Sequence, residues 1–134
     1  MNFIKGEILS ENSHICFQSA LKNLTFVIPE RFKAPIIKNS IKQVWLGIRP
    51  EDIHLKSETV VNNNQDVINS EIHLVEPLGN QTLIYFSFEN QQIVSEHRGF
   101  ATQVKGTLAQ LSLDLEKIHL FNFLTEERIE EENI

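Results

Sequence analysis

The sequence predicts an all-β protein built from small, closed or nearly closed barrels, with only short helical turns between strands. Three observations support this prediction. Apolar residues alternate with polar ones along most of the chain, as they do in half-buried strands. Asn, Ser, Gly or Pro follows almost every short apolar run, and these residues favour turns. A ten-residue segment also recurs 65 residues later, which indicates a duplicated unit.

The bulk composition limits the size and the partners of the protein. Its 134 residues, 41% of them hydrophobic, are enough for one domain with a core of its own. The formal net charge of −6 opposes contact with nucleic acid and with anionic lipid, so neither is an expected partner. No apolar run approaches the roughly 20 residues that span a bilayer, and the N-terminus does not resemble a signal peptide. We therefore expect a soluble, cytoplasmic protein.

Cysteine and the aromatic residues are interpreted as structural. Cys16 is the only cysteine, which excludes an internal disulfide, and it is expected to be a small buried hydrophobe. Nine Phe residues supply large apolar surfaces, whereas the single Trp and single Tyr leave little of the exposed aromatic surface that sugar sites use. The aromatic side chains are therefore expected mainly in the core.

The first half of the chain predicts strands at residues 4–8, 15–17, 24–28 and 44–48. Residues 29–40 contain two prolines and three cationic side chains, so we expect a long irregular connection there. Pro50 has a fixed φ and no N–H donor, which favours a short helical turn from Glu51. An extended segment should follow at residues 53–56.

The second half predicts strands at residues 67–76, 81–88, 91–95 and 107–113. The first two of these form a hairpin with a corner at Gly79-Asn80. Ile84, Phe86 and Phe88 share one face of their strand because side chains alternate. Residues 59–66 are the most polar stretch and are expected to link the two halves.

The repeat aligns residues 46–55 with residues 111–120. Five of the ten positions are identical: Leu46 with Leu111, Glu51 with Glu116, Ile53 with Ile118, His54 with His119 and Leu55 with Leu120. A duplicated unit of strand, helical turn and strand explains the identities, and the alternative is chance similarity between two short segments.

Short strands and glycine corners favour small barrels of the oligonucleotide/oligosaccharide-binding (OB) type, since closure removes unpaired sheet edges. We expect two half-repeats, about 1–60 and 66–124, and an acidic tail at residues 125–134. That tail carries five glutamates against Arg128 and is expected to be solvated or frayed.

Local catalytic motifs are missing from the sequence. It contains no GxxxxGK[ST] phosphate loop, no GxSxG elbow, no HExxH and no paired-cysteine zinc spacing. Duplication explains His54 and His119 more simply than a metal site does. We therefore expect no catalytic residue, no metal site and no cofactor in this chain.

Arg49 allows two interpretations. Its planar guanidinium could hold a carboxylate or several carbonyls at a contact with another domain or subunit. Alternatively, the same group could fix the turn that follows it from within. The two roles are compatible.

Several segments together resemble the C-terminal, TOBE-type domain of ATPases that power bacterial carbohydrate importers of the maltose and glycerol-phosphate type. These segments are LGIRPEDIHL at residues 46–55, VEPLGNQT at 75–82, LDLEKIHLF at 113–121 and the start Met1-Asn2-Phe3. The resemblance covers essentially the entire chain. The matching motif positions are Gly47, Arg49, Pro50, Glu51, Glu76, Leu78, Gly79, Asn80, Glu116, His119 and Phe121.

This resemblance implies a regulatory barrel without the ATPase half, located at the inner face of the plasma membrane when the transporter is assembled. It implies a homodimer, contacts with the ATPase domain and the permease subunits, and signals from a regulatory protein or a small molecule. ATP and Mg²⁺ would belong to the ATPase domain. The alternative function is a small-ligand module that captures a sugar or an oxyanion, with Arg49 and Gly79-Asn80 as the turns to inspect.

Overall fold

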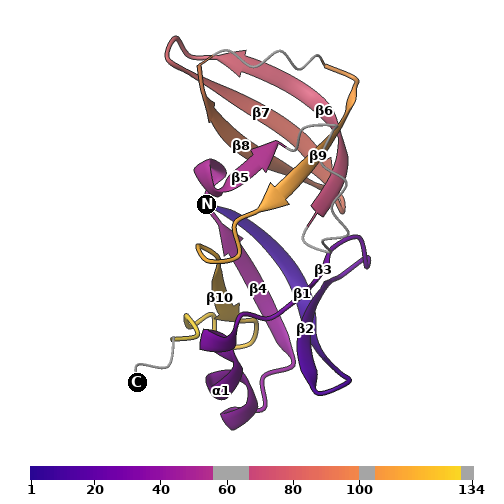
Figure 1. Ribbon diagram of the computed structural model, residues 1–134, viewed down its shortest axis with the longest axis vertical. Helices are drawn as coiled ribbons and strands as arrows, with labels where there is room; N and C mark the ends of the chain where they lie inside the picture. The colour runs from indigo at the N-terminus through magenta and orange to yellow at the C-terminus, as the bar shows by residue number, and fades with distance from the viewer. Residues whose placement is uncertain (56–66, 100–104, 131–134) are drawn as a thin grey trace.

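The strands in the described part of the chain form two five-stranded sheets that are stacked along the long axis of the molecule (Figure 1). The computed structural model describes residues 1–55, 67–99 and 105–130. Every strand pair within these residues is antiparallel. The prediction of an all-β, barrel-like fold with short helical segments is confirmed.

The first sheet has the strand order β10-β4-β1-β2-β3, and the second sheet has the order β5-β9-β6-β7-β8. The second sheet curls back on itself, because β8 also approaches β5. The strands of the first sheet are β1 (Asn2–Glu11), β2 (His14–Ser19), β3 (Thr25–Val27), β4 (Gln43–Ile48) and β10 (His119–Asn122). Those of the second sheet are β5 (Ile53–Leu55), β6 (Val67–Pro77), β7 (Gln81–Phe88), β8 (Gln91–Arg98) and β9 (Leu108–Leu113).

Residues 30–38 form a helix, α1 (Glu30–Lys38), so the expectation of an irregular connection at residues 29–40 is wrong. Pro35 lies inside α1, where proline normally removes a backbone hydrogen bond. Two buried side chains, Phe32 and Ile36, compensate because their spacing of four residues places them on one helix face. Of the three cations that suggested a loop, Lys38 is exposed, whereas Arg31 is partly buried and donates a hydrogen bond to the Leu115 carbonyl at 2.8 Å.

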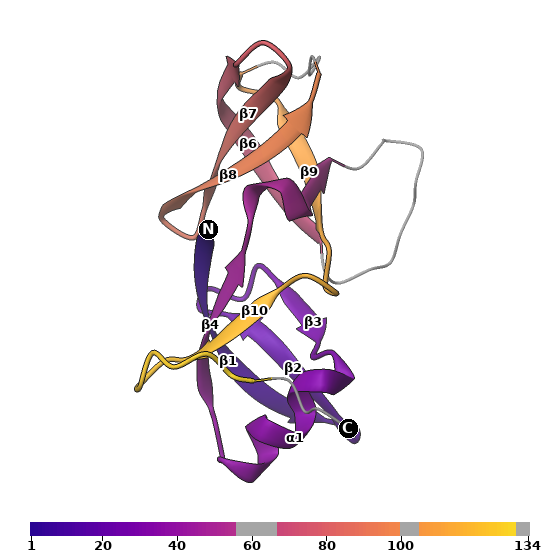
Figure 2. The same cartoon turned by 90° about the vertical axis from the view of Figure 1, so that its left-hand side faces the viewer.

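The two copies of the repeat cross between the sheets side by side (Figure 2). The first copy leaves β4, passes through a 3-10 turn, η1 (Pro50–Asp52), and enters β5. The second runs from β9 to β10 in the opposite direction. Leu46 pairs with Leu120 in the first sheet, and Leu55 pairs with Leu111 in the second. In the repeat, Leu46 corresponds to Leu111 and Leu55 to Leu120. Exchanging the two copies therefore turns one of these strand pairs into the other, which is an approximate two-fold relation.

Each sheet therefore contains one strand from the opposite part of the sequence. Strand β5 precedes the midpoint of the chain but belongs to the second sheet, and β10 follows it but belongs to the first. The predicted linker at residues 59–66 lies outside the described residues. The division into halves at about 1–60 and 66–124 stays a prediction.

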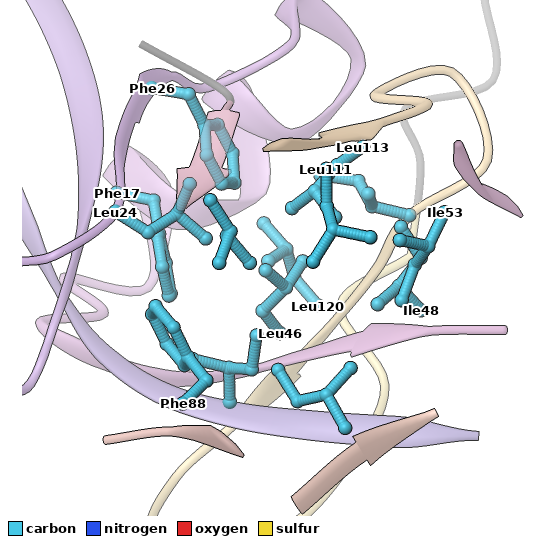
Figure 3. Close-up of a cluster of buried hydrophobic side chains, with 14 of the residues drawn as sticks. Phe17, Leu24, Phe26, Leu46, Ile48, Ile53, Phe88, Leu111, Leu113 and Leu120 are labelled. Atoms are coloured by element: carbon cyan, nitrogen blue, oxygen red, sulfur yellow. The ribbon is translucent and has the colours of Figure 1, made fainter. Parts of the chain in front are cut away.

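A single hydrophobic core runs through both sheets (Figure 3). Phe17 and Phe26 stack in the first sheet, with ring centroids 5.0 Å apart. Ile84, Phe86 and Phe88 of β7 are all buried, as their shared face predicts. Because the core is continuous, the two sheets form one packed body rather than two loosely tethered ones.

The acidic tail begins in ordered structure. The Ile129 amide donates to the Leu120 carbonyl at 2.7 Å, and the Ile129 side chain is buried. Arg128 forms an isolated bridge with Phe121. Residues 125–128 and 130 are exposed, as expected of a solvated tail, while the contacts of Arg128 and Ile129 show that this part is not frayed. Residues 131–134 lie outside the described residues.

Candidate functional site

An aromatic patch covers the outer face of the first sheet, on three neighbouring strands. Phe3, Trp45 and Phe121 come from β1, β4 and β10, at positions that alternate with core residues. The Phe3 and Phe121 rings meet edge to face, with centroids 5.7 Å apart. Phe3, Trp45, Phe121 and Glu126 line a hollow of ≈ 450 Å³. We call these four residues the aromatic patch.

Gly47 makes room for part of this patch. A Cβ at that position would lie 2.9 Å from the Phe121 ring and 2.8 Å from the Met1 sulfur. Both distances are shorter than a normal carbon contact. The glycine of the first motif thus lets two side chains lie directly over β4.

The patch corrects the interpretation of the aromatic residues as mainly internal. Phe3 is 46% exposed and Trp45 and Phe121 are only partly buried. Alternation along β4 places Val44 and Leu46 in the core and therefore Trp45 outside. The alternation along β4 was visible in the sequence, but a count of aromatic residues does not say on which face of a strand each of them lies.

A polar cleft lies at the joint between the two sheets. It brings the turn at Glu51 next to the hairpin corner at Asn80, so two of the sequence motifs meet in space. Its volume is ≈ 1060 Å³. The residues that line this polar cleft are Glu51, Asp52, His54, Asn80, Gln81, Glu96, His97, Arg98, Asp114 and Lys117.

The charges of the polar cleft are unequal. Four carboxylates face two permanent cations, Arg98 and Lys117, which leaves two negative charges in excess before the two histidines are counted. Asp52 is only 8% exposed. No described residue donates a hydrogen bond or forms an ion pair with its side chain. Its carboxylate oxygens are not among the fully buried side-chain atoms that lack a partner in the described residues, so they reach the solvent of the cleft.

His97 is the half-buried imidazole of this cleft. Burial lowers its pKa, and the nearby charge of His54 lowers the pKa further. The Ser95 hydroxyl lies 2.8 Å from the His97 Nε2 atom. The ring is therefore neutral near pH 7 and has one nitrogen occupied by a hydrogen bond.

The other predicted positions fall outside the cleft lining. Arg49 is exposed, and none of the described residues forms a hydrogen bond or ion pair with its guanidinium. Pro50 opens η1, as expected for proline at a first helical position. Leu78 and Gly79 form the exposed hairpin corner, where Gly79 has a φ of 89°.

Three further motif positions are dispersed. The Tyr85 hydroxyl lies 3.5 Å from the Glu76 carboxylate on the neighbouring strand. Glu116 lies in the exposed turn after β9, and its amide donates to Asp114 Oδ1 at 3.1 Å. His119 lies opposite Gly47, and burial, followed by the charge of Arg128, lowers its pKa. Thus Gly47 and Phe121 meet at the aromatic patch and Glu51 and Asn80 at the polar cleft, while the other motif positions line neither place.

The described residues contain neither a metal-binding cluster nor a membrane-spanning helix. No group of three or more His, Cys, Asp or Glu side chains there is arranged to hold a metal ion. No helix in that part of the chain is long and apolar enough to cross a membrane.

The fold, the crossing repeat and the paired turn motifs define an OB-type barrel domain. Residues 46–121 match the TOBE domain family, and the chain belongs to that family. The oligosaccharides import ATP-binding protein MsmX of Bacillus subtilis (strain 168) is 32% identical over 131 residues, which cover 96% of this chain and 34% of MsmX. The putative uncharacterized ABC transporter ATP-binding protein YcjV of Escherichia coli (strain K12) is 28% identical over 129 residues, 94% of this chain and 32% of YcjV.

This chain thus spans about one third of the length of the curated relatives it matches. Among solved structures, the cytoplasmic molybdate-binding protein ModG superimposes with a TM-score of 0.69. The alignment covers 89% of this chain and 94% of ModG at 12% sequence identity. At that identity the likeness supports the OB-type TOBE fold alone.

Proposed function

We propose that this chain is the regulatory and dimerisation domain of the ATP-binding subunit of a carbohydrate-importing ABC transporter. Its membership of the TOBE family and its similarity to MsmX support the transporter assignment. The domain itself catalyses no reaction. ATP and Mg²⁺ act in the ATPase domain of the complete subunit, and the assembly works with permease subunits at the inner face of the plasma membrane.

The aromatic patch is the observation that supports a dimerisation role. Exposed aromatic clusters of this kind are common at the centres of protein interfaces, where they bury much area at low entropic cost. In a two-fold dimer the same patch would face its copy. Arg49 follows β4 and is free of described partners, so it can pair with acidic groups at the rim of such an interface.

The test is the solution mass of the chain, measured by light scattering over a wide concentration range. We expect a dimer that Phe121→Ala weakens by at least about tenfold and Arg49→Ala weakens by less, because central aromatic contacts outweigh rim charges. Leu108→Ala is the matched control, since Leu108 is 82% exposed on the second sheet and away from the patch. A monomer at every concentration, or an equal effect of all three substitutions, would contradict the proposal.

A second candidate function is that of a small-ligand module. The specific observation behind it is the polar cleft, in which two motif turns meet beside the Asp52 carboxylate, which has no described protein donor and is open to the cleft. ModG, which shares the fold, is a molybdate-binding protein. Loss of ligand binding without any change in solution mass would separate this function from dimerisation.

A further inference from the structure

The polar cleft has the wrong charge for an oxyanion. Its lining carries Glu51, Asp52, Glu96 and Asp114 against Arg98 and Lys117. A dianion placed there would meet an excess of two negative charges at short range, where the screening by salt is incomplete. The cleft of this chain therefore disfavours the class of ligand that ModG binds.

The same lining is well suited to hydroxyl groups. A hydroxyl donates one hydrogen bond and accepts others, so it needs donors and acceptors close together. Arg98, Lys117 and the amides of Asn80 and Gln81 are donors, and the four carboxylates are acceptors. The His97 ring nitrogen that does not contact Ser95, Nδ1, can donate or accept a hydrogen bond, depending on the tautomer. We propose that the polar cleft binds a neutral polyhydroxylated ligand of the sugar class.

Asp52 is the residue of the cleft that most directly supports this proposal. Asp52 is the last residue of η1 and only 8% exposed, and its carboxylate, to which no described residue donates a hydrogen bond, is open to the cleft. Ligand hydroxyls can supply the missing donors, and hydrogen bonds to a charged acceptor are stronger than neutral ones. Sugar binding would thus satisfy a group that the fold leaves without a protein donor.

The inference rests on the second candidate function, and its experiment tests the ligand class separately from that function. The isotope-labelled chain is titrated with maltose, raffinose and myo-inositol as polyols, with molybdate and sulfate as oxyanions, and with spermidine as an organic cation. Amide chemical shifts at Asn80 and Gln81 are the readout. We expect saturable shifts with at least one polyol and none with the other two classes.

Variants then test the assignment of the site. Asn80→Ala removes an exposed amide of the cleft and should weaken polyol binding about five- to tenfold, the effect of one lost hydrogen bond. Asp52→Asn should weaken it at least about tenfold, with its native fold checked by circular dichroism. Asn69→Ala is the matched control, because Asn69 is an exposed amide on β6 outside the cleft lining.

The possible outcomes are distinct. Polyol shifts that both cleft variants weaken and Asn69→Ala does not would support the proposal. Saturable shifts with only an oxyanion or spermidine would overturn the sugar class but leave the ligand-module function standing. Silence across all three classes would overturn both. Light scattering measures dimerisation independently, so none of these titration outcomes decides the dimerisation proposal.

Discussion

The carboxylate of Glu89 accepts a 2.5 Å hydrogen bond from the Ser19 hydroxyl across the joint between the two sheets. It also accepts hydrogen bonds from the backbone amides of Leu21 and Asn23, at 2.9 and 3.2 Å. Glu89 lies in the turn between β7 and β8, with a φ of 47°. One side chain of the second sheet therefore holds the β2–β3 loop of the first.

Replacing Glu89 should destabilise the protein, because several donors lose their acceptor at once. We expect Glu89→Ala to lower the free energy of unfolding by about 2–3 kcal/mol, the typical effect of losing hydrogen bonds to a charged group. Urea denaturation followed by circular dichroism measures the change. Glu71→Ala, which removes an exposed glutamate from β6, should change it by less than about 0.5 kcal/mol. Equal effects of the two substitutions would disprove the role of Glu89.

Gly6 should not tolerate even one added methyl group. A Cβ there would lie 2.3 Å from the Phe17 ring and 2.7 Å from the Gln18 carbonyl oxygen. Both neighbours are fixed, one in the core and one in the backbone. We expect Gly6→Ala to cost about 1–3 kcal/mol of stability through overpacking. Gly106→Ala is a contrasting control: its Cβ would meet no neighbour, so any cost there comes from its φ of 89° alone. An unchanged thermal midpoint for Gly6→Ala would refute this account.

Acid should destabilise the fold through His97. Its pKa is lowered in the folded protein, first by burial and then by His54, whereas the unfolded chain has an ordinary histidine pKa near 6.5. Below about pH 6.5 the unfolded state thus binds more protons, and stability falls as the pH falls, by at most about 1.4 kcal/mol per pH unit for this group. Denaturation midpoints between pH 8 and pH 5 should follow this trend, and His97→Gln should reduce it, leaving the contribution of His119, whose pKa is also lowered by burial. If His73→Gln at an exposed site on β6 reduced it equally, His97 would not be the cause.

Cys16 should be unreactive in the folded state. Burial, and secondly the charge of Glu11, raise the pKa of its thiol, so little thiolate is present at neutral pH. We expect iodoacetamide to label Cys16 slowly in buffer and rapidly in denaturing urea. The ratio of the two rates, read by mass spectrometry, checks this expectation. Comparable rates in both conditions would show that β2 opens without global unfolding.

The fold could be read from the sequence wherever one local signal dominated. Alternation gave β7 its bounds, Gln81–Phe88, and Pro50 placed η1. Helix α1 was missed because two prolines and three cations outweighed the weak pattern of Phe32 and Ile36. That burial becomes evident only when the surrounding core is known, since tertiary packing overrides local propensity.

The candidate site was only partly predictable, for a different reason. Pro50, the Gly79-Asn80 corner and the family resemblance identified the turns containing Glu51 and Asn80, but their meeting in one cleft depends on the packing of the two sheets. His97 lies outside every motif, and Lys117, although it lies in the closing segment at residues 113–121, is not one of the matched motif positions. A turn can be predicted from neighbouring residues, but the residues that line a cleft between sheets are far apart along the chain. Local sequence patterns therefore do not show which of them meet.

The exchange of β5 and β10 between the sheets also governs how the chain can fold. The first sheet cannot be completed until β10, near the end of the described chain, is available to pair with β4. Pairing partners this distant make loop closure slow, so folding should be late and cooperative during synthesis. A chain cut near residue 60 would yield two fragments, each holding a strand that belongs to the other, and we expect them to fold only when they are mixed.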